Sequence, residues 1–364
     1  MKRRGWTMTG LAMLGGIVLA AAGVRAGELD PDRSPGPTMH TLTEIFDAIG
    51  ALQQQIEDLQ QEVIEPIAQE LESLQTSYAG LLSDMDTLSE LNQLFRWENG
   101  TVVCPTARVG DKGFLDGKLY EAVDRDLLIE RRDQGADLTC LCTTLVTDMR
   151  HLFSSTTFNE DISNWDVSNV TNMASMFAYS QFNQPIGNWD VSNVTHMGHM
   201  FTASDFNQPL SSWNVGSVTN MNNMFERSPF NRPIGAWDVG NVQTMRSMFL
   251  ETPFNHRLAN WDVSSVTRMH YMFADSAFNE PIGNWDVSNV SDMEDMFSNS
   301  PFNQPIGSWN VSNVSNMERM FFNASAFDQD LTGWCVSQFA SEPNNFSAGS
   351  GLRSSNMPVW GSCP

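Results

Sequence analysis

The chain has 364 residues, of which 41% are hydrophobic and 17% are charged, and its formal net charge is −23. This length predicts more than one structural unit, and the hydrophobic fraction argues against a disordered chain. The 43 acidic side chains against 20 basic ones would repel the phosphates of nucleic acids and disfavour anionic membrane surfaces. The composition therefore excludes nucleic-acid binding as a function.

Residues 1–26 have the features of a secretory signal peptide. A basic start at residues 2–4 precedes an apolar stretch at 11–22, and Ala26 ends a small-x-small cleavage site. An uncleaved anchor is the alternative, since residues 6–24 would just span a thin bilayer. The sequence thus predicts a secreted or cell-surface protein, with no transmembrane span in the mature chain.

A linker at 27–40 leads into an acidic segment at 41–97 with apolar residues at alternating steps of three and four. This rhythm predicts a helical stalk that forms either a coiled coil or a hairpin. Pro66 interrupts it and should kink or end the first helix. A homo-oligomer through residues 41–97 and a stalk that folds on itself fit the pattern equally well. The apolar positions are Leu42, Ile45, Ile49, Leu52, Ile56, Leu59, Val63, Ile67, Leu71, Leu74, Tyr78, Leu81, Met85 and Leu88.

Residues 98–145 form a small module ahead of a long repeat. Asp116 and Gly117 lie between apolar pairs and predict a hairpin over Lys112–Tyr120. We expect this module to cap the first repeat unit, because the end of a stack of repeats exposes its core.

Five cysteines flank the repeat, and an exported protein is expected to pair most of them. Cys104 with Cys142 could attach the module to the first unit. Cys335 with Cys363 could hold the C-terminal tail over the last unit. Cys140 is then the thiol left over.

Residues 146–336 hold eight copies of a 24-residue repeat, and residues 337–364 form a C-terminal cap. Phenylalanine, tryptophan and two methionines recur at this 24-residue interval, and each recurring position is called a column. One unit cannot bury its own apolar side chains, so stacked units are expected to form one continuous solenoid core. The tryptophan column is Trp165, Trp189, Trp213, Trp237, Trp261, Trp285, Trp309 and, one residue late, Trp334.

Within one unit the spacing predicts two short elements. Trp189 and Val191 alternate around Asp190 as in a short strand, and Val194–Phe201 steps like a helical turn or a short helix. Two asparagine columns, represented by Asn193 and Asn183, are expected to point inward and to satisfy buried turn amides of adjacent units.

The unit Phe-Asn-Gln-Pro-Ile-Gly-x-Trp-Asp-Val-Ser-Asn-Val-Thr-x-Met-x-x-Met-Phe resembles the BspA-like leucine-rich-repeat surface proteins. It is most similar to their mycoplasma-type lipoprotein repeat, a repeat of unknown function. The resemblance covers about residues 146–336. It implies a leucine-rich-repeat-like solenoid with short parallel strands and short helices, surface display, and a role in binding or adhesion.

One aspartate column is a candidate calcium site. Its carboxylates would stack at about 4.8 Å and repel one another unless a cation bridges them. The favoured interpretation is that each aspartate caps a turn through its own backbone amides. The column consists of Asp166, Asp190, Asp238, Asp262 and Asp286.

The best candidate for a contact surface is the set of positions that vary between repeat units while the core stays constant. Neutral drift of an exposed surface is the alternative. His196 and His199 belong to this set and are interpreted as surface variants, not as metal ligands. The set is Asn172, Ser175, Tyr179, His196, His199, Asn220, Asn223, Arg227, Arg268, Tyr271, Asp292, Asp295 and Arg319.

No phosphate-binding loop and no nucleophile motif occurs in the sequence, so we expect no cofactor, no catalytic residue and no enzymatic activity. The function expected is that of an exported or cell-surface repeat protein that binds an extracellular protein or glycan. The alternative is a structural envelope component that self-associates through stalk and solenoid.

Overall fold

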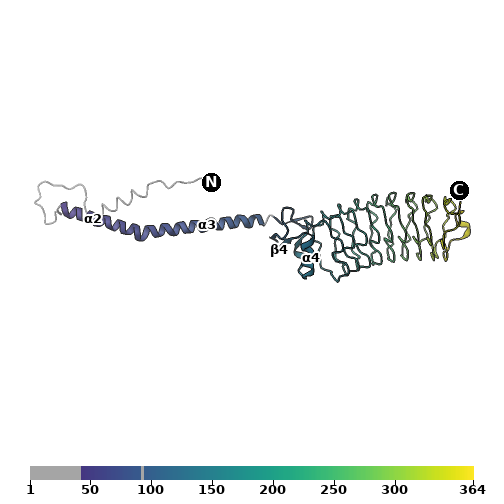
Figure 1. Cartoon of the computed structure of the whole chain (residues 1–364), viewed down its shortest axis with the longest axis horizontal. Helices are drawn as coiled ribbons and strands as arrows, with labels where there is room; N and C mark the ends of the chain where they lie inside the picture. Colours follow the sequence, from purple (N-terminus) through teal and green to yellow (C-terminus); the bar gives the residue numbers. More distant parts are fainter. Residues whose placement is uncertain (1–41, 92–93) are drawn as a thin grey trace. The chain divides into compact units, whose positions relative to one another are not determined.

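The computed structural model describes residues 42–91 and 94–364 (Figure 1). The signal peptide expected at 1–26 and the linker expected at 27–40 lie outside the described residues. The chain divides into two compact units, one ending at Ser83 and one running from Asp84 to Pro364. Among the helices of the described residues, none has both the length and the hydropathy of a membrane-spanning segment.

One continuous helical run occupies residues 42–91. It consists of α2 (Leu42–Leu59), a π-helical turn η1 (Gln60–Ile64) and α3 (Glu65–Leu91). Pro66 therefore does not end the helix. It lies in the first turn of α3, directly after the π-helical turn, where a missing N–H is tolerated. The hairpin interpretation is wrong for these described residues.

Two small sheets build the N-terminal module. In the first, β1 and β2 are antiparallel, and in the second, β4 lies between antiparallel β3 and parallel β5. The strands are β1 (Arg96–Glu98), β2 (Thr101–Val103), β3 (Lys112–Leu115), β4 (Lys118–Ala122) and β5 (Leu141–Cys142).

The hairpin predicted around Asp116 and Gly117 is confirmed as β3–β4. Both turn residues have positive φ, 51° and 77°, as a two-residue turn of this type requires. The helix α4 (Arg125–Asp133) follows, and the carboxylate of Asp124 caps it by accepting the N–H of Leu127 at 3.0 Å. Two 3₁₀ turns complete the elements, η2 (Leu138–Cys140) and η3 (Ser354–Asn356).

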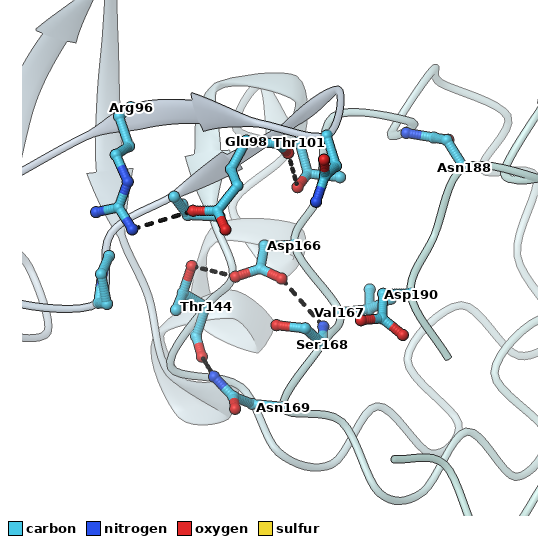
Figure 2. Close-up of a pocket in the computed structure, with 13 residues that line it drawn as sticks. Arg96, Glu98, Thr101, Thr144, Asp166, Val167, Ser168, Asn169, Asn188 and Asp190 are labelled. Atoms are coloured by element: carbon cyan, nitrogen blue, oxygen red, sulfur yellow. Dashed lines mark hydrogen bonds and ion pairs between the residues drawn. The ribbon is translucent and has the colours of Figure 1, made fainter. Parts of the chain in front are cut away.

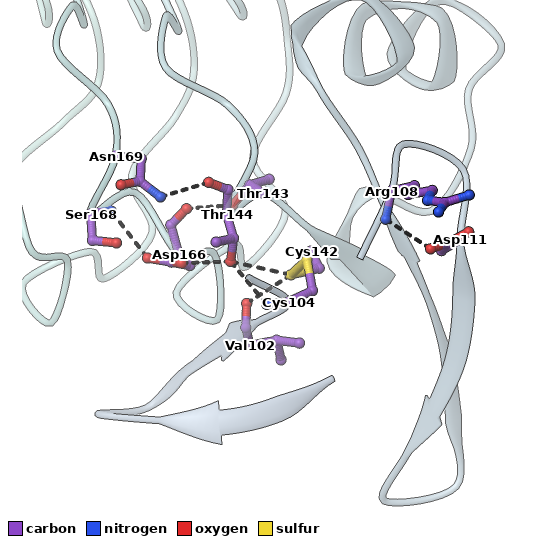
Figure 3. The surroundings of a disulfide bond; sticks show 10 residues. All are labelled: Val102, Cys104, Arg108, Asp111, Cys142, Thr143, Thr144, Asp166, Ser168 and Asn169. Atoms are coloured by element: carbon purple, nitrogen blue, oxygen red, sulfur yellow. Dashed lines mark hydrogen bonds between the residues drawn. A yellow bond between two sulfur atoms is a disulfide. The ribbon is translucent and has the colours of Figure 1, made fainter. Parts of the chain in front are cut away.

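The disulfides Cys104–Cys142 and Cys335–Cys363 confirm the expected pairing, and Cys140 is free. Figure 3 shows that the first disulfide lies beside the start of the repeat. The N–H of Cys104 donates to the Thr144 hydroxyl at 3.1 Å, and that hydroxyl donates to Asp166 at 2.6 Å. The disulfide and this hydrogen-bond chain together attach the module to the first repeat unit.

The repeat units form coils that stack on one another, and backbone hydrogen bonds join each coil to the next (Figure 1). The N–H of His199, for example, donates to the carbonyl of Asn222 at 2.7 Å, and that of Phe201 to Met224 at 2.9 Å. A column of parallel bridges runs from Asp148 to Asn316 in steps of 24 residues. The 24-residue period is thus the spacing of a backbone ladder.

The secondary structure inside each coil differs from the expectation. Between Thr143 and Arg353, where every residue is described, the chain forms turns and isolated bridges but no helix and no strand. No strand forms at Trp189–Val191, and Val194–Phe201 contains turns and not a short helix. The reason is that N–H groups along the coil alternate between two uses. That of Met200 closes a turn on Met197 at 3.1 Å, whereas those of its two neighbours cross to the next coil.

Two residues in each coil adopt a left-handed backbone, with φ between 50° and 61°, which neither a strand nor a right-handed helix allows. Such a conformation costs a residue other than glycine, asparagine or aspartate about 1–2 kcal/mol. None of the residues at these positions is glycine. They are His151, Ser155, Ser175, Tyr179, His199, Ala203, Asn223, Arg227, Ser247, Glu251, Tyr271, Asp275, Asp295, Asn299, Arg319 and Asn323.

The core of the stack contains the phenylalanine, tryptophan and methionine columns, almost all of them buried. Phenylalanine rings of adjacent coils stack, as Phe201 does on Phe225 with ring centroids 5.7 Å apart. Each indole N–H donates to a carbonyl of the preceding coil, as that of Trp237 does to Leu210 at 2.9 Å. The tryptophans therefore satisfy backbone carbonyls inside the core as well as filling it.

The asparagine columns lie outside the core, contrary to the expectation. Asn193 is exposed, and its amide donates to the carbonyl of Ser168 in the preceding coil at 2.7 Å. In the second column the side-chain oxygen of Asn183 accepts the N–H of Asn207 at 2.9 Å. These residues do join adjacent coils, but they do so from the rim, because the aromatic columns already fill the interior.

A stack joined in this way has unpaired groups at both ends. At the first coil, Arg125 of α4 donates to the carbonyls of Asp148 and Arg150 at 2.7 and 2.8 Å, and Arg132 donates to Leu152. These carbonyls have no coil before them to supply an N–H. Two arginines of the module thus complete the ladder at its N-terminal end.

At the other end, the tail takes the place of one more coil. The N–H of Phe321 donates to the carbonyl of Phe346 at 2.8 Å, and residues 344 and 348 accept in the same way from the last coil. Phe346 is fully buried and packs edge-on against Phe321 at 5.4 Å. The C-terminal cap thus continues the ladder for one step before the disulfide closes it.

Removing the arginine donors should weaken the first coil. Arg125→Met keeps the apolar stem and loses both hydrogen bonds, so we expect the free energy of unfolding to fall by about 2 kcal/mol. Chemical denaturation followed by tryptophan fluorescence would measure it. The control is Arg257→Met, because that guanidinium is 89% exposed and lies 3.8 Å from Glu280. We expect a change below about 0.5 kcal/mol there. Equal losses in the two variants would contradict the role of Arg125.

A glycine substitution at a left-handed position should not lower the stability of the protein. In Ala203→Gly the relief of about 1–2 kcal/mol of backbone strain exceeds the entropy penalty of about 0.4–1 kcal/mol for a new glycine. Stability should therefore stay constant or rise. Ala178→Gly is the matched control, since Ala178 is buried and is not left-handed, and it should lose about 1 kcal/mol. Thermal and chemical denaturation of both variants would show whether the signs differ as expected.

Candidate functional site

The predicted contact residues fall into three adjacent columns of the stack, which we call the contact face. One is the column of parallel bridges, and the other two are the left-handed columns. The bridge column holds Asn172, His196, Asn220, Arg268 and Asp292. The left-handed columns hold Ser175, His199, Asn223, Tyr271, Asp295 and Arg319, and then Tyr179 and Arg227.

The side chains of the contact face differ in their exposure to solvent. Tyr179 is 61% exposed and is the one large hydrophobic side chain classed as exposed between Val146 and Val336, a stretch that is described throughout. His196, His199, Arg227 and Arg268 are exposed as well.

The prediction is wrong for Asn223 and Asp295, which are 7% and 2% exposed. Asn223 donates to Glu226 at 2.6 Å, and Asp295 accepts from Arg319 at 2.9 and 3.1 Å. Side chains of their own and neighbouring coils cover both residues. These two residues therefore support the face from within instead of contacting a partner.

Ion pairs connect neighbouring coils across the face. Arg227 pairs with Glu251 at 2.9 Å, and the guanidinium of Arg319 lies 4.0 Å from the ring centroid of Phe322 while pairing with Asp295. Both ion pairs join residues 24 apart in one column. Opposite charges at the repeat step were thus a signal in the sequence that could have revealed these pairs.

A tyrosine and two acids form a partly buried polar group in the face. The hydroxyl of Tyr271 donates to Glu294 at 3.2 Å. Burial raises the pKa of Tyr271 to about 12, and the negative charges of Asp295 and Glu294 add to this effect. Tyr271 therefore stays a neutral hydrogen-bond donor throughout the physiological range. Sequence reasoning missed Glu294, because its column carried no contact prediction.

The histidines of the face contact their own coil. The Nδ1 atom of His196 lies 2.8 Å from the Thr195 hydroxyl, and that of His199 lies 3.4 Å from Thr202. Although part of the His199 side chain is exposed, loss of solvent around the ring lowers its pKa and favours the neutral form. In the described residues, no group of three or more histidine, cysteine or acidic side chains is arranged to hold a metal ion.

The aspartate column forms turn caps, as favoured from the sequence. The Oδ1 atom of Asp190 accepts the N–H of Ser192 at 3.0 Å, and Asp166, Asp238, Asp262 and Asp286 accept in the same way from the residue two positions on. Hydrogen bonds from the Ser264 side chain and backbone lower the pKa of Asp262. Hydrogen bonds of this kind stabilise the charged form of the Asp262 carboxylate.

One polar cavity of about 270 Å³ lies between the N-terminal module and the first two coils, and sequence reasoning did not identify it. Figure 2 shows Arg96 and Glu98 of β1 on one side and Asp166 and Asp190 on the other. Arg96 pairs with Glu98 at 3.0 Å. Asp166 is buried, and each of its oxygens accepts a hydrogen bond, one from Thr144 and one from the N–H of Ser168. Its buried carboxylate therefore joins module and stack.

The repeat matches a known family. Residues 129–229, 201–277 and 251–360 each match the family model described as "Mycoplasma protein of unknown function, DUF285". No curated protein matches the chain, and no solved structure matches it. The three matched segments overlap and together span residues 129–360, which is more than half of the chain. The chain therefore belongs to the Mycoplasma protein family of unknown function, DUF285.

Proposed function

We propose that this chain is an exported or cell-surface repeat solenoid of the BspA-like, leucine-rich-repeat-like class, and that it binds an extracellular protein or glycan without catalysis. The observation that carries the proposal is the pair of left-handed columns. Glycine would adopt this backbone without strain, yet varied side chains such as Tyr179 and Arg227 stand there. Selection for surface contacts explains why strain is retained at these positions.

The chemistry of the contact face suits a polar partner. Exposed Tyr179 offers a flat aromatic surface, and Arg227 offers a planar set of donors, two residue types that are enriched where binding energy concentrates. Acids are present as well: Glu251 pairs with Arg227, and Glu294 accepts a hydrogen bond from Tyr271. A partner with both hydrogen-bond donors and acceptors, such as a folded protein or a glycan, complements this mixture.

Export is supported by the cysteines and by the first residues of the sequence. Disulfides persist in oxidising compartments and are rare in the cytosol of most organisms, and this chain has two. Residues 1–26 add the composition of a secretory signal. A structural envelope component that self-associates is the second candidate, and the exposed apolar residues of α2 and α3 favour it.

Truncating the face should abolish binding without unfolding the stack. Alanine already stands at position 203 of the second left-handed column, so Tyr179→Ala and Arg227→Ala fit the backbone. We expect the double variant to lose at least about tenfold in affinity, since one hot-spot residue contributes about 2 kcal/mol. Binding of the labelled protein to glycan arrays and to a panel of extracellular proteins would measure this.

The control variant changes the aspartate column, which lies in a different segment of each coil. Asparagine already stands there at positions 214 and 310 and caps the same turn, so Asp238→Asn and Asp262→Asn preserve the fold while removing charge. The control should bind as the wild type does, in calcium and in EDTA. Loss of calcium-dependent binding in the control alone would move the site to the aspartates. Hydrolysis of an arrayed glycan would contradict the non-catalytic assignment.

A further inference from the structure

A long apolar stripe on the helical run 42–91 is exposed to solvent in this chain. Its side chains from Ile45 to Leu81 are 44–65% exposed, except for Leu52, which is partly buried. Exposed apolar side chains in such a continuous row are unfavourable in water unless a partner covers them. The stripe is Ile45, Ile49, Leu52, Ile56, Leu59, Val63, Ile67, Leu71, Leu74, Tyr78 and Leu81.

The spacing of this stripe contains one irregularity. Steps of three and four alternate as a heptad repeat requires, except that the step from Val63 to Ile67 is four where three is expected. One residue is therefore inserted into the heptads near Pro66. In an uninterrupted α-helix, one extra residue would rotate the second half of the stripe by about 100° away from the first half.

The π-helical turn η1 removes this rotation. It covers Gln60–Ile64, directly before Pro66, and the N–H of Glu65 donates to the carbonyl of Gln60, five residues back. A π-helical turn holds about one residue more than an α-helical turn. The inserted residue is thus accommodated in the turn, and both halves of the stripe lie along one face of the helix.

We propose that a second copy of this chain covers the stripe, in a parallel, in-register, two-stranded coiled coil. An identical partner carries the same inserted residue at the same level, so its stripe follows the same path. Before the π-helical turn, Ile49, Ile56 and Val63 occupy a positions and Leu52 and Leu59 occupy d positions, the combination that favours two parallel strands.

The charge distribution permits this pairing although the stalk is acidic. Acids such as Asp47, Glu57 and Asp58 lie on the outer positions b, c and f. The e and g positions that border the seam between Phe46 and Leu82 hold mainly glutamine and small residues. Two acidic helices can therefore meet along the stripe while most of their charges stay in solvent.

The two acids at flanking positions decide the orientation. In a parallel pair a g residue faces the e residue of the partner's next heptad, which places Glu62 opposite Ala68 and Glu70 opposite Gln75. In an antiparallel pair with the inserted residues aligned, Glu62 faces Glu70 twice. Like charges at these positions are unfavourable, so the parallel orientation is preferred.

Pairing would bring two contact faces into one assembly. A ligand that repeats on a surface would then bind with avidity, because the second contact is intramolecular. That consequence rests on the proposed function, whereas the pairing itself does not.

Disulfide trapping in the full chain tests the orientation. In a Cys140→Ser background, Leu59→Cys at a d position meets its own counterpart only in the parallel, in-register pair. Mild oxidation should convert most of this variant to a covalent dimer, seen on non-reducing gels and by light scattering. The matched control is Gln54→Cys on the outer f position, which should stay monomeric on the gel. In an antiparallel pair, position 59 would instead lie opposite position 71. A disulfide dimer that forms only when Leu59→Cys is mixed with Leu71→Cys would therefore overturn the parallel assignment.

A second pair of variants tests the role of the π-helical turn. Insertion of two alanines after Gln61 rotates the second half-stripe by about 200°. It should weaken self-association about 100-fold or more, since about half of the seam is lost. Deletion of Gln61 restores regular heptads and should leave the dimer intact. Light scattering over a dilution series measures both. A wild-type chain that is monomeric at about 10 μM, or equal masses for the two variants, would overturn the proposal.

Discussion

The backbone ladder between adjacent coils is the interaction on which the rest of this protein depends. Each coil donates alternate N–H groups to the next one, so neither end of the stack is satisfied by the repeat itself. The module before the repeat supplies Arg125 and Arg132 to the first carbonyls, and the tail supplies the carbonyl of Phe346 to the last N–H groups. The two caps are therefore parts of the ladder, and the disulfides hold both of them in place.

The same ladder produces the contact face. Two residues in each coil are left-handed, and none of them belongs to the aromatic and methionine columns of the core, although Asn223, Ser247 and Asp295 are buried. Positions such as Tyr179 and Arg227 can then vary, since it is their backbone N–H groups that join the ladder to the next coil. Packing thus constrains the residues of the core columns, while the residues of the contact face can vary and could determine which partner is bound.

In the stalk, a local irregularity of the helix, the π-helical turn, keeps the apolar residues before and after it on one face. The sequence shows an additional residue in the heptads, and Pro66 beside it suggests a break. The structure contains a π-helical turn at Gln60–Ile64 instead, so the helix continues to Leu91. Spacing alone could not decide between a hairpin and a continuous helix, because both bury the same residues against another helix.

Features that depend on residue type at fixed spacing could be predicted from the sequence alone. These were the repeat period, the buried aromatic and methionine columns, the turn at Asp116 and Gly117, the two disulfides and the aspartate turn caps. Only the tertiary structure decided which way polar side chains point: Asn193 lies on the rim, and Asp295 is buried beneath Arg319. It also decided that the coils contain turns instead of strands and helices. The physical reason is that the burial of a polar residue, and the partner of each N–H, depend on the neighbouring coil, which one repeat unit does not contain.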